Sequence, residues 1–431
     1  MQILMTLMMT TIVTAMNEKR FFPIKSGIAC QSKWAWSTLY LNRGTNHSCH
    51  RASTSKLTIE DFDNFHNTDT KVRDRKLMLS GQWPTGGCEY CQKIETSGGF
   101  SDRMLQNTIP NLYPVELDTD INSVIISPTI LEVFFDNTCN LSCVYCLPEV
   151  SSKIADEYNR YGSFDQQGVR LMPITPINTS ELQERFWVWM QDNFQSLKRF
   201  HFLGGEPFLQ KGFDTLLDFV DNHPNPDCEI NFISNLMLPH ARFVGQIERI
   251  KTLVARRKLK RLDFTASIDC WGPEQEYIRH GLRLDQWTQN FEYLVSQRWI
   301  KLQINQTIAS LSIKTMPELL TKLAEWNQIR PVGHYFSVTE PGPSYLRPNI
   351  FGPGVFDKDF DLILSIMPNN TDQDKSAVKY MSGIANQIKN STINTVEINK
   401  LFVFLNENDR RRNSNWKTLF PWLVEFEQRV V

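Results

Sequence analysis

The strongest constraint on the fold is an alternation of short apolar runs with longer amphipathic stretches between residues 129 and 340. The runs have the length and the β-branched or aromatic content of buried strands, and the stretches between them have helical periodicity. The expected strands are 129–136, 197–205, 228–235, 261–269, 301–310 and 333–340. The expected main helices are 180–197, 213–223, 239–257, 284–298 and 315–328. Repeated strand–helix alternation predicts an α/β fold with a parallel sheet and right-handed crossovers.

Three cysteines, Cys139, Cys143 and Cys146, follow the first expected strand in the segment DNTCNLSCVYCLPE. Binding sites in parallel α/β folds gather at the carboxyl ends of the strands, so we expect this loop at the functional edge of the sheet. Three thiolates at this spacing can hold three corners of a cubane iron–sulfur cluster and leave one iron open to a ligand. The spacing also permits a zinc site with a distant fourth ligand, or no metal site at all.

The chain before residue 126 has a different character, because cysteine, tryptophan and glycine are concentrated there and regular periodicity is weak. It holds a second set of thiols: Cys30, Cys49, Cys88 and Cys91. Four thiolates can bind a complete iron–sulfur cluster or a closed zinc site, with His50 as an alternative to one thiolate. We therefore expect residues 16–125 to form a small module organised by bound metal. Seven of the nine cysteines fall into the two sets, which favours metal or redox chemistry over disulfides.

The composition and charge of the chain bear on two classes of partner, nucleic acids and membranes. The 431 residues carry a net charge of −1, with 41% hydrophobic and 22% charged residues, so we expect no nucleic-acid partner. The apolar run at 1–15 is too short to span a bilayer and has no basic residue before it. We expect it to be a spurious or disordered extension ahead of a start at Met16, and we expect no membrane association.

The motif CNLSCVYC after the first strand and the motif FLGGEP at the end of the second resemble the core of the radical S-adenosylmethionine (SAM) enzymes. The resemblance covers the six expected strands and implies a partial (β/α)6 barrel over residues 126–345, followed by a mostly helical extension over 346–431. It implies that Cys139, Cys143 and Cys146 hold a [4Fe–4S] cluster whose open iron binds SAM. Reductive cleavage of SAM would give a 5′-deoxyadenosyl radical that abstracts hydrogen from a substrate.

The resemblance also implies contacts to SAM from the first two strand ends. Tyr145 would lie against the adenine, with simple packing as the alternative. Gly204 and Gly205 would let the chain approach the methionine part of SAM, with a tight turn as the alternative. Glu206 would receive the SAM ammonium group or orient the neighbouring backbone, and the alternative is a solvated loop carboxylate.

Further contacts are implied at the later strands. Asp269 would accept a hydrogen bond from a ribose hydroxyl, unless it caps the helix that follows. Arg279 would pair with the SAM carboxylate, unless it is an ordinary surface arginine. Four polar residues at strand ends complete the set that the resemblance implies: Ser234, Asn235, Ser267 and Asn305.

The N-terminal cysteines beside such a core resemble the twitch module of auxiliary-cluster radical SAM proteins, in the group that carries it N-terminally. This implies a second iron–sulfur cluster that accepts an electron from a substrate radical or binds substrate, with a structural role as the alternative. The implied substrate is a peptide or protein, with a sugar or small metabolite as alternatives, and the implied electron donor is a flavodoxin or ferredoxin. Reduced thiolates indicate the cytoplasm. The rival function is a zinc-stapled, non-catalytic interaction protein on a decayed barrel.

Overall fold

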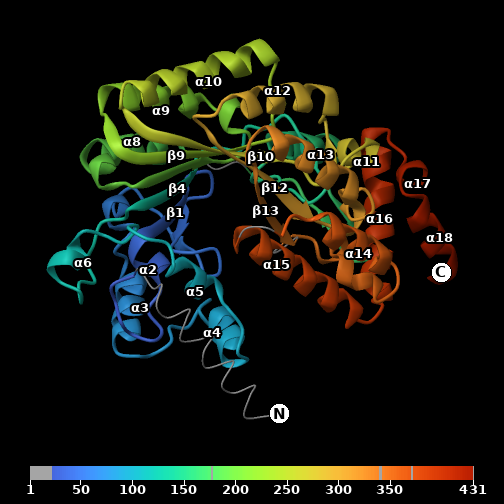
Figure 1. Cartoon of the computed structure of the whole chain (residues 1–431), viewed down its shortest axis with the longest axis horizontal. Helices are drawn as coiled ribbons and strands as arrows, with labels where there is room; N and C mark the ends of the chain where they lie inside the picture. The colour runs from blue at the N-terminus through green and yellow to red at the C-terminus, as the bar shows by residue number, and fades with distance from the viewer. Residues whose placement is uncertain (1–21, 176–177, 339–341, 370–371, 431) are drawn as a thin grey trace.

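The computed structural model describes residues 22–175, 178–338, 342–369 and 372–430. It is organised by a sheet of nine strands in the order β13-β12-β10-β9-β8-β4-β1-β2-β3 (Figure 1). The six strands expected from the sequence are mutually parallel neighbours in it. They are β4 (Ile130–Phe134), β8 (Arg199–Leu203), β9 (Asn225–Ser234), β10 (Leu259–Ser267), β12 (Lys301–Ile308) and β13 (Gly333–Val338). The prediction of an α/β fold with a parallel sheet is therefore confirmed.

The expected helices connect these strands and several of them cover one face of the sheet (Figure 1). They are α8 (Ser180–Asn193), α9 (Lys211–Asn222), α10 (His240–Ala255), α12 (Leu284–Ser296) and α13 (Met316–Ile329). Strand phenylalanines point into this layer, as where Phe200 stacks on Phe186 of α8 and Phe264 meets Phe243 of α10. Alternate strand residues point to the opposite face, and several of them are polar, among them Glu132, His201 and Asn231.

The first 125 residues contain more regular structure than their sequence indicates. Strand β1 (Trp36–Tyr40) pairs in parallel with β4, and β2 (Thr45–His47) and β3 (Ser55–Lys56) extend the same sheet. The helices here are α2 (Gln31–Ala35), α3 (Asp69–Leu79), α4 (Glu89–Thr96), α5 (Asp102–Gln106) and α6 (Glu116–Thr119). A small separate core around Trp34 and Met78 holds them together. The N-terminal part therefore continues the main sheet.

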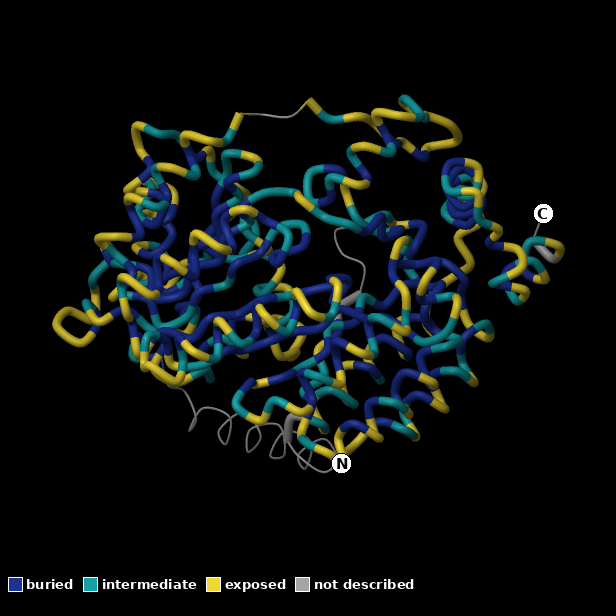
Figure 2. Tube along the Cα trace, turned by 90° about the horizontal axis from the view of Figure 1, so that it is seen from above, coloured by how far each residue is buried: buried dark blue, intermediate teal, exposed yellow. Residues whose placement is uncertain are grey.

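The chain after residue 345 is largely helical. Its helices are α14 (Asp357–Ile366), α15 (Asp372–Lys389), α16 (Thr395–Arg412), α17 (Trp416–Leu419) and α18 (Pro421–Val430). Arg412 of α16 forms a buried ion pair of 2.9 Å with Glu157 of α7 (Ser152–Tyr161), the helix that follows the three-cysteine loop. The extension is thus joined to the main sheet domain, and its inward faces are buried (Figure 2).

Four short strands complete the fold: β5 (Ser142–Cys143), β6 (Phe164–Gln166), β7 (Val169–Leu171) and β11 (Arg279–His280). The last of these follows α11 (Pro273–Ile278). Within the described part of the chain, no helix has both the length and the apolar character needed to cross a membrane. The expected extension at 1–15 lies outside the described residues.

Candidate functional site

The three-cysteine loop leaves β4 and is tied to a distant segment and to the start of the helix that follows it. The residue pair Ser142–Cys143 forms a short antiparallel ladder with Arg279–His280, in which Cys143 is paired with Arg279. At the start of the loop, the Cys139 N–H donates to Ser152 Oγ at 3.1 Å, and that hydroxyl lies 3.1 Å from the Cys139 carbonyl oxygen. These bonds fix the backbone of the first two cysteines. Sequence reasoning missed Ser152, whose position at the start of a helix just after the loop was the available signal.

The thiols of this loop lie within electrostatic range of one another. Burial raises the pKa of all three, and negative charge on Cys143 raises the pKa of Cys139 and Cys146 further. The guanidinium of Arg279 acts in the opposite direction on Cys143 and Cys146. A bound cation is therefore needed to keep three thiolates together at neutral pH.

No group of three or more cysteine, histidine or acidic side chains in the described ranges is arranged to hold a single metal ion. A single zinc ion would need thiolates about 2.3 Å from it. A cubane cluster has the milder requirement of one thiolate for each of three irons. The loop supplies three thiols, which is the number of donors that a cubane cluster with one open iron takes.

The two glycines of FLGGEP allow a close approach between backbones. A Cβ on Gly205 would lie 2.3 Å from the carbonyl oxygen of Thr138, and a Cβ on Gly204 would lie 2.3 Å from that of Asp136. The backbone of this motif also bonds the same segment, through Gly205 N–H to Asp136 and Glu206 N–H to Thr138 at 3.1 and 2.7 Å. The structure therefore gives these glycines a role that the sequence did not suggest, since they hold the chain that leads into Cys139. Their approach to SAM stays a prediction.

Glu206 is buried, so the alternative of a solvated loop carboxylate is wrong. It is 1% exposed, and its carboxylate accepts hydrogen bonds from Ser234 Oγ at 2.8 Å and from the Asn235 N–H at 2.7 Å. The side chain thus orients backbone at the end of β9. Burial raises the pKa of Glu206 to about 7, although these hydrogen bonds act against the shift.

The raised pKa of Glu206 predicts a pH dependence of stability. Between pH 4.5 and about 7 the folded protein holds a proton on Glu206 that the unfolded chain has released. The contribution of this group to the free energy of unfolding should therefore be fully present below pH 4.5 and be lost as the pH rises to about 7. Urea unfolding of wild type and Glu206→Gln over this range measures it. The wild type should lose stability relative to the variant as the pH rises, and the opposite slope would contradict the assignment.

Tyr145, Asp269 and Arg279 form one buried cluster. The Asp269 carboxylate accepts from Tyr145 Oη at 2.6 Å and from two Arg279 nitrogens at 2.9 Å each. It also accepts from the Thr307 N–H at 2.8 Å. A carboxylate offers about four lone-pair sites, so Asp269 is saturated in this structure. A ribose hydroxyl would have to displace one of these donors.

This cluster decides two of the alternatives left open by the sequence. Gly272 precedes α11 at its N-cap, so Asp269 is not the helix cap. Arg279 is 6% exposed and ion-paired, so it is not a surface arginine. The contacts of Tyr145, Asp269 and Arg279 with SAM stay predictions.

The remaining polar candidates differ in whether their polar atoms already have hydrogen-bond partners within the protein. Ser234 bonds Glu206 and the Leu236 N–H, and the Asn235 amide bonds Asn140 and the Met237 N–H. Two other candidates, Ser267 and Asn305, are paired in register across β10 and β12. The Asn305 Oδ1 is buried without a hydrogen-bond partner in the part of the chain described. This orphaned acceptor is consistent with a ligand at the strand ends.

The four N-terminal cysteines also lie within electrostatic range of one another. Burial and then the charge on Cys49 raise the pKa of Cys30 to about 11, and burial raises that of Cys88 to about 12. Charge on Cys49 also raises the pKa of Cys91. All nine cysteines of the chain are free thiols. The charges of these thiols thus act on one another, but no three of the described ligand-type side chains are arranged around a single ion, so a cluster or a zinc site at these cysteines stays a prediction.

Sequence reasoning missed Lys33, a buried cation beside these thiols. Burial lowers its pKa, but the charges of Cys88 and Asp74 outweigh burial and raise it overall. Lys33 Nζ lies 2.7 Å from Asp74 Oδ2, and both side chains are 4% exposed. The available signal was one charged residue within the otherwise uncharged CQSKWAW segment. The positive charge of Lys33 lowers the pKa of Cys88, although burial raises that pKa overall.

At Gly87 the backbone before the C-x2-C turn packs closely against the loop that carries Cys49. An added methyl group at this position should therefore push the two segments apart. A Cβ at this position would lie 2.1 Å from the Arg51 carbonyl oxygen, at a φ of +125°. We expect Gly87→Ala to displace Cys88 and therefore to lower any metal content of the N-terminal set. Metal analysis of Gly87→Ala in a Cys139→Ala/Cys143→Ala/Cys146→Ala background measures this.

The matched control is Gly98→Ala, which has a φ of +80° but no atom within 4 Å of the added Cβ. It should cost about 1–3 kcal/mol through backbone strain and keep the metal. Equal metal contents in the two variants would contradict the role given to Gly87.

No protein-family model and no curated protein matches this sequence. Among solved structures, the chain is similar to Streptococcus suis SuiB bound to the precursor peptide SuiA, with 16% identity and a TM-score of 0.33. That alignment covers 72% of this chain and 62% of SuiB. A second similar structure is TYW1 with a lysine-pyruvate adduct bound, with 16% identity and a TM-score of 0.26. That alignment covers 56% of this chain and 69% of TYW1. Similarity at this level does not establish a shared fold, so function has to be inferred from the site.

Proposed function

We propose that the protein is a radical SAM enzyme built on a partial (β/α)6 barrel. The observation that carries the proposal is the arrangement of the three-cysteine loop. It leaves the first parallel strand at its carboxyl end, groups three thiols, and lies directly against the two glycines of FLGGEP. Two motifs that are 55 or more residues apart in the chain thus meet at one edge of the sheet, where such folds place their sites.

Cys139, Cys143 and Cys146 would hold a [4Fe–4S] cluster. With SAM bound, that group supplies a 5′-deoxyadenosyl radical for hydrogen abstraction from substrate. The side chains of the protein would bind SAM and the substrate and orient them for this reaction. Glu206 holds the end of β9 through the Asn235 N–H, and Arg279 lowers the pKa of the nearby Cys143 and Cys146 thiols. The unpartnered Asn305 Oδ1 would accept a hydrogen bond from SAM.

The N-terminal thiols would hold a second, auxiliary iron–sulfur cluster in a twitch-like module. The support is the mutual electrostatic influence of these thiols and the buried cation Lys33, whose charge acts on Cys88 and Cys49. We propose a peptide or protein substrate, a flavodoxin or ferredoxin as electron donor, and a cytoplasmic location, where thiolates stay reduced.

The test is anaerobic quantification of iron and sulfide together with an assay for 5′-deoxyadenosine from SAM and dithionite. Wild type should bind about eight irons, and Cys139→Ala/Cys143→Ala/Cys146→Ala should bind about four. Only the wild type should cleave SAM. The matched control is Cys228→Ala, which alters a fully buried thiol outside both sets and should keep iron and activity.

The outcomes separate the competing proposals. Four irons in wild type and none in the triple variant would retain the enzyme and leave the N-terminal thiols to zinc or a structural role. A colourless protein that contains only zinc after anaerobic reconstitution would overturn the enzyme and favour the non-catalytic interaction protein.

A further inference from the structure

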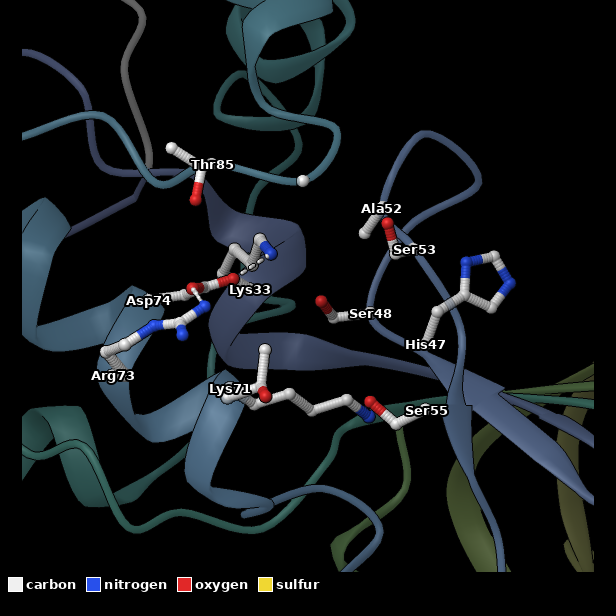
Figure 3. Close-up of a pocket in the computed structure, with 12 residues that line it drawn as sticks. Lys33, His47, Ser48, Ala52, Ser53, Ser55, Lys71, Arg73, Asp74 and Thr85 are labelled. Carbon is white, nitrogen blue, oxygen red and sulfur yellow. Dashed lines mark hydrogen bonds and ion pairs between the residues drawn. The ribbon is translucent and has the colours of Figure 1, made fainter.

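A polar cavity of about 250 Å³ lies in the N-terminal part of the chain, among α2, α3 and the segment around β2 and β3 (Figure 3). At roughly 30 Å³ per water molecule, it has room for about eight waters. Its lining includes the cations Lys33, Lys71 and Arg73, together with several serine and threonine hydroxyls. None of the described lining residues is a cysteine, although the cavity adjoins the thiol set through Lys33 and Ser48.

The cavity carries more positive than negative charge. Asp74 is its one described carboxylate, and it is already paired with Lys33 at 2.7 Å and with Arg73 at 3.2 Å. Lys71 is 4% exposed and donates to Ser37 Oγ at 3.1 Å and to the Phe65 carbonyl at 2.6 Å. It has no ion-pair partner among the residues with described positions. Its partners are both neutral, so an anion bound beside this amine would stabilise its charged form.

An unused hydroxyl gives a second, independent indication of a ligand. Ser48 is 2% exposed and lines the cavity, and within the described ranges its hydroxyl has no hydrogen-bond partner. In Figure 3 its side chain points across the cavity toward Lys33 and Asp74. This hydroxyl faces the cavity, where a ligand can accept its hydrogen bond.

We propose that this cavity binds the phosphate group of a small-molecule ligand. Ammonium groups act as point charges, and hydroxyl donors from several sides suit a tetrahedral oxyanion. A carboxylate would favour the planar fork of a buried arginine, whereas Arg73 is 58% exposed. Burial, with Arg75 and Lys33 nearby, lowers the pKa of Lys71 well below its usual value, and a bound phosphate would favour its charged form.

The test is calorimetric titration of the full-length protein with inorganic phosphate, at constant ionic strength set by sodium chloride. Wild type should bind one phosphate saturably with a Kd in the millimolar range or tighter. Ser48→Ala should weaken binding about fivefold and Lys71→Met more than about tenfold, as expected for a neutral and a charged hydrogen bond. The matched control is Lys76→Met, an exposed lysine on the same helix that does not line the cavity.

Several results would overturn the proposal. One is the absence of saturable binding in wild type, and another is equal binding by Ser48→Ala and the Lys76→Met control. Acetate that binds as tightly as phosphate would assign the cavity to carboxylates instead. Ser48→Ala removes an unpartnered hydroxyl and should fold normally, so it decides the matter if Lys71→Met fails to fold. Binding needs no iron, so this outcome is independent of the proposed enzyme function.

Discussion

Replacing Arg279 by methionine is expected to lower the free energy of unfolding by about 3–5 kcal/mol, because it leaves a buried carboxylate without its cation. Arg279 and Asp269 are 6% and 0% exposed and share two hydrogen bonds of 2.9 Å. Arg279 also pairs in register with Cys143 and lowers the pKa of the Cys143 and Cys146 thiols. The variant should therefore also lose iron from the three-cysteine loop. Urea unfolding and anaerobic iron analysis measure the two effects.

The matched control for this prediction is Arg283→Met, four residues further along the chain. Arg283 is 66% exposed and lies 3.9 Å from Asp285, so its loss should change stability by less than about 1 kcal/mol. The double variant Asp269→Asn/Arg279→Met removes both charges and should recover part of the stability that the single change loses. A double variant no more stable than Arg279→Met would show that the ion pair is not the cause.

The sequence predicted the strands and main helices because their signals are local. Each run such as 301–310 or 228–235 carries its own apolar content, and the helix between two runs carries its own periodicity. The parallel direction of these strands then follows from the strand–helix alternation alone. Strand β1 escaped prediction as a member of this sheet because its partner, β4, lies about ninety residues away.

The candidate site residues could be named from their types and spacing, but their contacts could not. The two cysteine sets come from spacing, and what each of them binds stays a prediction. The partners of Asp269, however, come from three segments: the cysteine loop, β11 and β12. No local pattern in the chain states that these segments converge. The saturation of Asp269 and the burial of Lys33 are consequences of tertiary packing, which a single sequence does not reveal.

The second large effect is expected from Gly205→Ala. The added Cβ would lie 2.3 Å from the Thr138 carbonyl oxygen and 2.7 Å from that of Asn137, and both are backbone atoms that cannot rotate away. The segment that enters Cys139 must therefore move, and overpacking of this kind costs about 1–3 kcal/mol. We expect the variant to lose stability by this amount and to bind fewer irons at the three-cysteine loop, as measured by urea unfolding and iron analysis.

Gly245→Ala is the matched control, because it adds the same methyl group where no atom lies within 4 Å. Gly245 is exposed within α10, so alanine should stabilise the helix by about 0.5–1 kcal/mol and leave iron binding unchanged. The comparison separates the steric contact from the loss of a glycine as such. If Gly205→Ala kept full iron content while losing stability, the FLGGEP motif would support the fold without positioning Cys139. Loss of both would show that the close backbone contact sets the geometry of the cysteine loop.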